Sequence, residues 1–276
     1  MQRNIYNQLL RWKNKKKRKP LILNGARQVG KTYILREFGQ KEYQKVAFFS
    51  LDRDQKVREV FEKSGSTADI LMALSAISQV DITPGDTLLV LDEIQDCPKA
   101  LEALKFFCEE TPDIHIVVAG SLLGLSLHDG TSYPVGKVEE MRLYPMTFLE
   151  FLNAMGKTQL VEIIENKKWA VVNMLQMELI GLLRQYYYVG GMPAAVRAHV
   201  EHNSLQEIRS IQLQILADYR RDFSKHAPAR EVPRINMVWD SIPPQLAKEN
   251  KKFIYGALKK SARAKDFEIA IQWLID

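Results

Sequence analysis

The feature that most constrains the fold is a glycine-rich octapeptide that follows a short apolar run. Residues 21–23 are Leu-Ile-Leu and read as a buried strand, and residues 25–32 are Gly-Ala-Arg-Gln-Val-Gly-Lys-Thr. Apolar residues at helical spacing follow in residues 33–38, and Gly39 is expected to end that helix. A strand, a glycine loop and a helix in direct succession predict an α/β fold.

Short apolar runs and helices continue to alternate up to about residue 145. After a first helix at 5–12, further strands are predicted at 46–51, 87–91 and 114–119, and helices at 54–63, 67–79 and 98–110. This alternation is typical of a parallel sheet covered by helices on both faces. Beyond residue 145 the pattern is helical, with helices expected at 147–155, 159–166, 168–187, 193–201 and 204–223. We therefore predict an α/β core over residues 1–145 and an all-α region over 146–231.

The last segment, residues 232–276, is predicted to contain three short helices separated by Pro243-Pro244 and by Gly256. The final amphipathic helix reaches Asp276 without a cap or a following element. We therefore expect a helix-turn-helix-like region that is incomplete.

Charge and hydropathy restrict the partners that the chain can have. Lys and Arg number 39 against 33 Asp and Glu, which permits a polyanionic partner such as DNA without requiring one. One dense basic run lies at 13–19, and a second, looser basic region spans 220–234 and is followed by 248–265; solvated helix faces are the alternative interpretation. No apolar stretch approaches 18 residues and the first residues do not resemble a signal peptide, so we expect a cytoplasmic protein without a membrane partner.

The octapeptide fits the pattern G-x-x-x-x-G-K-T of a phosphate-binding loop, the Walker A motif. Backbone N–H groups of such a loop surround phosphate oxygens, Lys31 neutralises them, and Thr32 offers a hydroxyl to Mg²⁺. A glycine turn without a ligand is the alternative. The predicted nucleotide-binding residues are Gly25, Ala26, Arg27, Gln28, Val29, Gly30, Lys31 and Thr32.

A second motif follows the apolar run at 87–91, which ends on Asp92-Glu93 as in a Walker B motif. In open α/β sheets ligands bind at the carboxyl ends of the strands, so Asp92 is predicted to hold Mg²⁺ through water and Glu93 to act as general base on the attacking water. An ordinary strand end is the alternative. The strand at 114–119 leads to Ser121, whose hydroxyl is expected near the same edge, or else caps a helix.

Five separated stretches can be compared with known families: Gly-Ala-Arg-Gln-Val-Gly-Lys-Thr (25–32), Leu-Asp-Glu-Ile-Gln-Asp (91–96), Gly-Ser-Leu-Leu (120–123), Leu-Tyr-Pro-Met-Thr-Phe-Leu-Glu-Phe (143–151) and Gly-Gly-Met-Pro (190–193). In this order, and over residues 3–276, the chain resembles the predicted prokaryotic ATPases of the AAA+ superfamily. Members carry an AAA-type ATPase domain followed by a C-terminal domain of unknown function.

The resemblance implies a five-stranded P-loop core of AAA+ type, a helical lid and a winged-helix-like region. It implies that Ser121 senses the γ-phosphate and that Pro193 lies against adenine. On sequence grounds alone, residues 190–193 equally fit a helix stop followed by a proline at the start of the next helix. The resemblance further implies that the family's C-terminal domain lies beyond residue 276, so the chain is expected to be truncated.

Two observations concern catalysis and the choice of base. Relatives usually have Gly-Arg where this chain has Gly136-Lys137, and lysine lacks the planar donor fork of arginine; Arg142 lies nearby. The two Asn-Lys pairs, at 166–167 and 250–251, do not continue as Asn-Lys-x-Asp, the motif usual in GTP-binding proteins. Adenine is therefore the expected base.

Together these features predict a Mg²⁺-dependent ATPase of AAA+ type that hydrolyses ATP slowly and switches conformation with its nucleotide. Two alternatives remain: a DNA-binding regulator whose helix-turn-helix region is gated by ATP, and a nucleotide-gated scaffold without turnover. AAA-type sites are often completed by a neighbouring subunit, so a homo-oligomer is a further expectation.

Overall fold

A computed structural model describes residues 1–120, 133–249, 252–259 and 263–275 of the chain. They form two compact units, Met1–Ile211 and Gln212–Asp276. The domain boundaries expected at residues 145 and 231 stay predictions. Among the described residues, no helix combines the length and the apolar character needed to cross a membrane.

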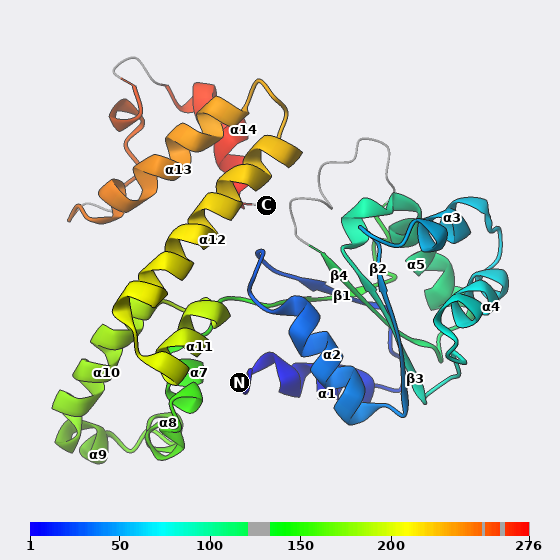
Figure 1. The fold of residues 1–276 in the computed structure, drawn as a ribbon, viewed down its shortest axis with the longest axis horizontal. Coiled ribbons are helices and arrows are strands. Elements are labelled where there is room, and N and C mark those ends of the chain that lie inside the picture. Colours follow the sequence, from blue (N-terminus) through cyan, green and yellow to red (C-terminus); the bar gives the residue numbers. More distant parts are fainter. Residues whose placement is uncertain (121–132, 250–251, 260–262, 276) are drawn as a thin grey trace. The chain divides into compact units, whose positions relative to one another are not determined.

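A five-stranded sheet forms the centre of the first unit (Figure 1). Its strands run in the order β2-β3-β4-β1-β5, and every neighbouring pair is parallel. The strands are β1 (Leu21–Asn24), β2 (Lys45–Ser50), β3 (Thr87–Asp92), β4 (His115–Gly120) and β5 (Glu139–Arg142). Asn24, Asp92 and Gly120 are the last residues of β1, β3 and β4. Because the strands are parallel, all three lie at the carboxyl ends of the strands, where ligands bind in open α/β folds. The predicted fold class is confirmed.

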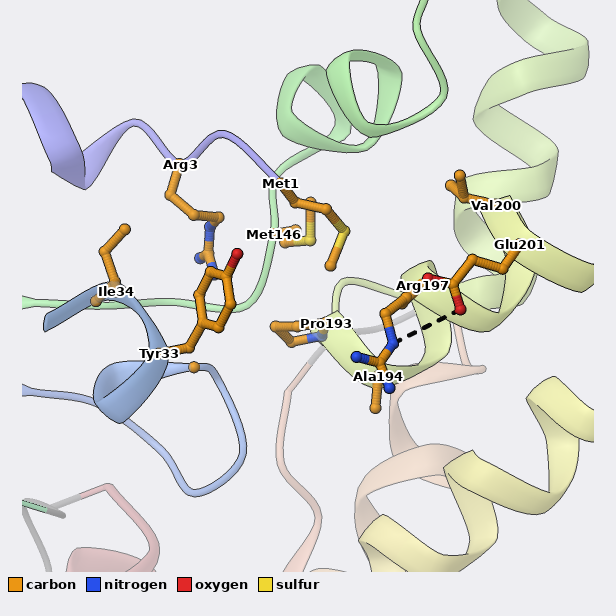
Figure 2. Close-up of a pocket in the computed structure, with 11 residues that line it drawn as sticks. Met1, Arg3, Tyr33, Ile34, Met146, Pro193, Ala194, Arg197, Val200 and Glu201 are labelled. Atoms are coloured by element: carbon orange, nitrogen blue, oxygen red, sulfur yellow. Dashed lines mark ion pairs between the residues drawn. The ribbon is translucent and has the colours of Figure 1, made fainter. Parts of the chain in front are cut away.

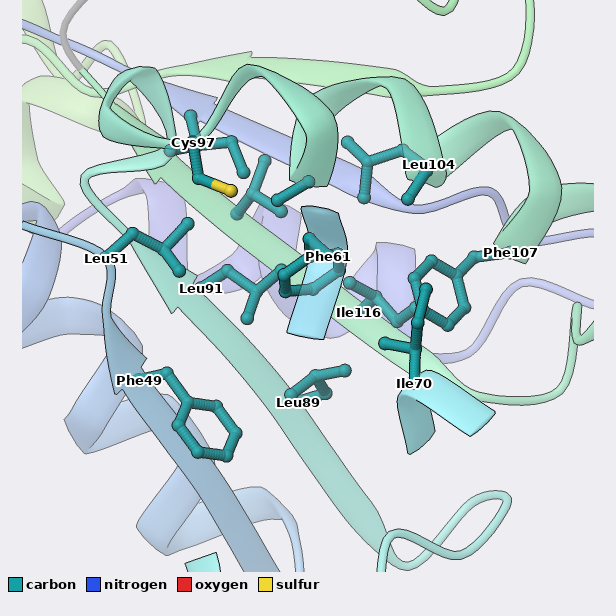
Figure 3. Packing of buried hydrophobic residues seen from close by; sticks show 14 of the residues in the cluster. Phe49, Leu51, Phe61, Ile70, Leu89, Leu91, Cys97, Leu104, Phe107 and Ile116 are labelled. Atoms are coloured by element: carbon teal, nitrogen blue, oxygen red, sulfur yellow. The ribbon is translucent and has the colours of Figure 1, made fainter. Parts of the chain in front are cut away.

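Alternate residues of the strands pack against helices on the two faces. On one face Leu89, Leu91 and Ile116 meet three helices, as Figure 3 shows: α3 (Gln55–Lys63), α4 (Thr67–Ser78) and α5 (Pro98–Glu110). On the other face Leu88 and Val90 meet two helices, α1 (Ile5–Lys13) and α2 (Lys31–Glu42). Because helices cover both faces of the sheet, β1, β3 and β4 are buried along their whole length.

The remainder of the first unit is helical. It contains α7 (Phe148–Ala154), α8 (Thr158–Glu165), α9 (Trp169–Met174), α10 (Gln176–Val189), α11 (Pro193–His202) and the beginning of α12 (Leu205–His226). Two apolar clusters hold these helices together, one around Phe151 and Val196 and one around Leu152 and Leu182. We call residues 147–202 the lid.

Four local expectations were wrong. Helix α2 continues through Gly39, because a residue without a side chain lets Val46 pack directly on the helix: a Cβ there would lie 2.8 Å from a Val46 methyl. Strand β5 was not predicted from the residue pattern. The helix expected at 168–187 is divided at Leu175 into α9 and α10. Pro243 and Pro244 lie within the last turn of α13 (Val232–Leu246) rather than between helices.

The second unit holds the rest of α12 together with α13, the 3-10 turn η2 (Tyr255–Ala257) and α14 (Ala264–Ile275). Phe223 makes edge-on contacts with Trp239, at a ring-centroid distance of 5.2 Å, and with Trp273, at 5.5 Å. Aromatic pairs of this geometry are stabilising beyond the area they bury. No strand occurs among the described residues of this unit.

Candidate nucleotide-binding site

The phosphate-binding loop connects β1 to α2 in the predicted way. Gly30 is the N-cap of α2 and has φ +96°, a left-handed conformation that glycine adopts without steric cost. Helix α2 begins directly at Lys31, so its first backbone N–H groups, which have no partner within the helix, lie at the loop. Together with the helix dipole they favour an anion at this position.

The amine of Lys31 lies inside the loop. Its Nζ donates to the carbonyl oxygens of Gly25 at 2.7 Å and of Ala26 at 3.1 Å. Burial lowers the pKa of Lys31, and the neighbouring carboxylates Glu93 and Asp92 act in the opposite direction. The amine is thus held by neutral carbonyl groups, which a phosphate oxygen can replace as a stronger, charge-assisted acceptor.

Thr32 and Asp92 come together although sixty residues separate them. The Thr32 hydroxyl donates to Asp92 Oδ2 at 2.6 Å, and Asp92 Oδ1 accepts from the backbone N–H of Glu93 at 3.1 Å. Burial raises the pKa of Asp92, while the Thr32 hydrogen bond lowers it. A hydroxyl and a carboxylate side by side are oxygen ligands of the kind that Mg²⁺ takes, directly or through its waters, so these two residues fit the predicted ion.

Glu93 follows Asp92 at the end of β3 and has φ +55°, which turns the chain into a short 3-10 helix, η1 (Ile94–Asp96). Its Oε2 accepts a 2.6 Å hydrogen bond from Nε2 of Gln95, a buried residue on that turn. Gln95 was not singled out by sequence reasoning, although its amide stands next to Asp92-Glu93 in the motif. This hydrogen bond holds the Glu93 carboxylate at the carboxyl edge of the sheet.

A cavity of about 490 Å³ lies beside the loop within the first unit. Figure 2 shows Arg3 and Tyr33 on one side of it, and Pro193 and Arg197, from α11, on the other. Gly30 also lines the cavity. The full lining is Met1, Arg3, Gly30, Tyr33, Ile34, Met146, Pro193, Ala194, Arg197, Val200 and Glu201.

Several lining residues were not predicted. Arg3, Tyr33 and Arg197 carry no motif, and their place at the cavity follows only from the fold. Arg197 pairs with Glu201 one turn along α11, at 3.8 Å, and both side chains are exposed. Pro193 lines the cavity and is also the first residue of α11, and its expected contact with adenine stays a prediction.

Lys137 and Arg142 are not among the residues that line the cavity. Ser121 lies outside the described residues. Lys137 pairs with Glu109 of α5, at 2.8 Å, and Arg142 is the exposed last residue of β5.

The basic run at 13–19 is largely occupied by contacts within the first unit. Lys13 donates to the Glu42 carbonyl, Lys15 pairs with Glu139, and Lys19 donates to the Gly136 carbonyl. In the second unit Arg220 pairs with Asp240, and Arg234 with the buried Glu231 at 3.0 Å. These contacts favour the alternative that both basic runs are ordinary helix surface rather than a site for DNA.

Comparison with known proteins agrees with this geometry. Residues 17–152 match a family model described as an AAA domain, and residues 180–276 match a model described as a domain of unknown function. No curated protein matches the chain significantly.

Three solved structures that resemble the chain are a chain of Drosophila ORC bound to DNA, C. elegans PCH-2 and the Pif1 helicase from Candida albicans. Their sequence identities are 14%, 13% and 13%, and their TM-scores 0.42, 0.34 and 0.33. The matches cover 90%, 59% and 56% of this chain, and 68%, 48% and 43% of the others. This chain thus spans less than half the length of the last two.

The Walker A loop on β1, the Asp-Glu pair on β3, the strand β4 between them and the family match lead to one conclusion. The chain contains an AAA domain over residues 17–152, followed by a C-terminal region that matches a domain of unknown function.

Proposed function

We propose that this chain binds ATP with Mg²⁺, hydrolyses it slowly and uses the nucleotide as a conformational switch. The observation that carries the proposal is the 2.6 Å contact between Thr32 and Asp92, next to Lys31 and Glu93 and beside a cavity that Gly30 and Pro193 line. Metal-binding oxygens, a phosphate-binding amine and a carboxylate base are the parts that phosphoryl transfer from ATP to water requires.

The phosphates occupy the loop of residues 25–32. Backbone N–H groups at the start of α2 donate to their oxygens, and Lys31 exchanges the carbonyls of Gly25 and Ala26 for a phosphate. The adenine enters the cavity, where Pro193, Ile34 and Met146 offer apolar surface. This assignment agrees with the base inferred from the lack of an Asn-Lys-x-Asp motif.

Thr32 would hold Mg²⁺ through its hydroxyl, and Asp92 would hold it through water. When bound, the ion supplies positive charge that neutralises the oxygens of the transferred phosphoryl group. Because Asp92 already holds the Thr32 hydroxyl, the two ligands are positioned before the nucleotide arrives.

Glu93 is the general base. A water oxygen attacks the γ-phosphorus, its proton passes to the Glu93 carboxylate, and the bond between the γ-phosphorus and the ADP oxygen breaks. Gln95 keeps the carboxylate oriented through its 2.6 Å hydrogen bond. Ser121, on the resemblance, senses the γ-phosphate.

The cavity also supports the role as a switch. Gly30, Tyr33 and Ile34 belong to the loop and α2, whereas Pro193, Ala194 and Arg197 belong to the lid. A nucleotide in the cavity therefore contacts both parts, and its hydrolysis changes the contacts that hold them together.

Binding and turnover of ATP with Mg²⁺ test the proposal. Lys31→Ala should weaken ATP binding about 100-fold or more, because it removes the buried charge that faces the phosphates. Glu93→Gln should leave affinity within about threefold and reduce turnover by about 10²- to 10⁴-fold, because it removes only the base. Affinity is measured by titration calorimetry and turnover by phosphate release, over a range of protein concentrations, with GTP as competitor.

Matched controls lie on α2 and α5. Lys41→Ala changes an exposed lysine of α2, and Glu102→Gln changes a glutamate of α5 that pairs with Lys99; both should behave as the unaltered chain does. ATP binding that survives Lys31→Ala would contradict the assignment of the loop. Unchanged turnover in Glu93→Gln would remove that residue from the mechanism.

A further inference from the structure

Arg3 is almost fully buried and contacts three parts of the first unit that are far apart in the sequence. Its Nε pairs with Glu150 Oε1 at 3.1 Å, its Nη1 donates to the Val29 carbonyl at 3.0 Å, and its Nη2 donates to the Tyr144 carbonyl at 2.6 Å. The side chains of Arg3 and Glu150 are 6% and 5% exposed. One guanidinium therefore joins the phosphate-binding loop, the connection that follows β5, and the first helix of the lid.

We infer that Arg3 is a positioning residue that couples the conformation of the phosphate-binding loop to the placement of the lid. This inference rests on the proposed nucleotide binding and adds a route by which the bound nucleotide acts on helix α7. The route runs from the Val29 carbonyl, through the guanidinium, to Glu150.

On the loop side, the contact fixes a peptide group that belongs to the binding site. The Val29 carbonyl and the Gly30 N–H share one planar trans peptide, so they point in opposite directions. Holding the carbonyl with Arg3 sets the direction of the Gly30 N–H at the start of α2. A phosphate that draws on this N–H rotates the same peptide plane and changes the hydrogen bond to Arg3.

On the lid side, Glu150 is fixed by more than its ion pair. Its Oε1 also accepts from the backbone N–H of Asn4 at 2.8 Å, and its Oε2 accepts from the N–H of Thr147, also at 2.8 Å. Thr147 returns the contact, because its hydroxyl accepts from the Glu150 N–H, which completes a capping box at the start of α7. A shift of the guanidinium therefore moves the first turn of α7.

The connection between core and lid is held on both sides. Arg3 binds the Tyr144 carbonyl, while the Met146 N–H donates to Gly191 at 2.6 Å and the Met146 carbonyl accepts from Tyr186 at 2.8 Å. Gly191 directly precedes the Met192-Pro193 start of α11. Residues 144–146 thus link Arg3 with the cavity wall that α11 provides.

The ion pair of Arg3 and Glu150 is suited to transmit small movements. Two nearly buried charges tolerate little separation, because each left alone would lack both water and a partner. Arg3 also donates to two carbonyls in the fixed planar geometry of a guanidinium, which lysine cannot reproduce. A binding event that alters one contact therefore alters the others, and the effect is reciprocal between loop and lid.

A double-mutant cycle tests the coupling in the full chain, with ADP and Mg²⁺ as the probe. The variants are Arg3→Met, Glu150→Gln and the two combined. Calorimetry gives the affinity for ADP, and hydrogen exchange gives the protection of the α7 amides with and without ADP. Arg3→Lys provides a milder variant that keeps the charge beside Glu150 but loses the two carbonyl contacts.

We expect each single variant to weaken ADP binding about tenfold and the double variant to be at most about threefold weaker than either, because the two residues act as one unit. The protection of α7 that ADP confers on the unaltered chain should be lost in all three, and Arg3→Lys should lose most of it while remaining folded. Leu9→Ala is the control for stability: it removes a buried side chain from α1, so it should lower Tm and keep the affinity within about twofold.

The outcomes separate the two ideas. If the unaltered chain binds no ADP, the proposed function fails and the coupling fails with it. If the unaltered chain binds ADP and Arg3→Met and Arg3→Lys bind it equally well, with α7 still protected and only Tm lowered, Arg3 is a structural residue and the coupling alone is overturned. Effects of Arg3→Met and Glu150→Gln that multiply in the double variant would also overturn it.

Discussion

His115 shows how a single buried residue makes the stability of the first unit depend on pH. Its Nδ1 lies 2.7 Å from the Tyr43 hydroxyl, and its ring meets those of Tyr43 and Trp12 edge-on. Burial lowers the pKa of His115 to about 4, with Arg18 and Lys13 acting in the same direction. The imidazole is therefore neutral in the folded chain at neutral pH.

The sign of the pH effect follows from this shift. In the unfolded chain the histidine titrates near 6.5, so between pH 6.5 and about 4 the unfolded state binds the extra proton and gains stability relative to the folded state. We expect His115 to cost about 2 kcal/mol of folding free energy when the pH falls from 7 to 5. Denaturant unfolding at pH 7 and at pH 5 checks this. Between the two pH values His115→Gln should lose about 2 kcal/mol less unfolding free energy than the unaltered chain loses.

The control for this prediction is His202→Gln, which removes an exposed histidine from α11. Between pH 7 and pH 5 this variant should lose as much stability as the unaltered chain does. An equal loss in His115→Gln and in the unaltered chain would mean that His115 is not the residue responsible.

Single residues of the candidate site differ in whether the sequence alone could predict them. Lys31, Thr32, Asp92 and Glu93 were predicted because they follow strands in a motif whose spacing is local. Arg3 and Gln95 could not be inferred, because neither belongs to a pattern of known spacing. The contacts of Arg3 span 26 to 147 residues, and no periodicity of the sequence encodes such distances.

At the scale of elements, local signals predicted some boundaries and tertiary packing decided others. Helix α5 has the predicted bounds because Pro98 opens it. Strand β5 was missed because its four residues, Glu-Glu-Met-Arg, alternate between half-buried and exposed at the edge of the sheet. Helix α2 was predicted too short, because the packing of Val46 on Gly39 is not visible in the sequence around that glycine.

The joint between the lid helices α7 and α11 provides a test at this scale. A Cβ at Gly191 would lie 2.4 Å from the Met146 carbonyl oxygen and 3.0 Å from the Met146 nitrogen. Gly191→Ala must therefore displace backbone at the connection. We expect it to destabilise the chain by about 2 kcal/mol or more, in the range of strained or overpacked sites, and to weaken nucleotide binding.

Gly181→Ala is the matched control, because Gly181 lies inside α10 and an added Cβ would meet nothing within 4 Å. It should be neutral or stabilise the chain by up to about 1 kcal/mol, since alanine favours a helix more than glycine does. Thermal unfolding of both variants checks the pair, and equal stability of the two would refute the close contact at Gly191.

At the scale of the whole molecule, every residue of the cavity and of the described candidate site belongs to the unit Met1–Ile211. A chain that ends at Ile211 keeps Ile208 and Ile211, which pack on the lid cluster around Phe151. We expect this shortened chain to fold and to bind ATP within about threefold of the full chain, because no lining residue is removed. Calorimetry on both chains gives the comparison.

A shortened chain that folds, as judged by cooperative thermal unfolding, but binds ATP far more weakly would show that residues 212–276 contribute to the site. Equal affinity combined with slower turnover would instead assign them to catalysis or assembly.

The strand order has a consequence for how the chain acquires its fold. Strand β1 lies between β4 and β5, so the strand that carries the phosphate-binding loop finds its neighbours only in residues 115–120 and 139–142. Until those residues have left the ribosome, residues 21–24 have no strand to pair with, and closing such long loops slows folding. The octapeptide is thus synthesised before the strands that organise it. A nucleotide that binds there selects chains whose sheet is already assembled, and by mass action it stabilises that late state.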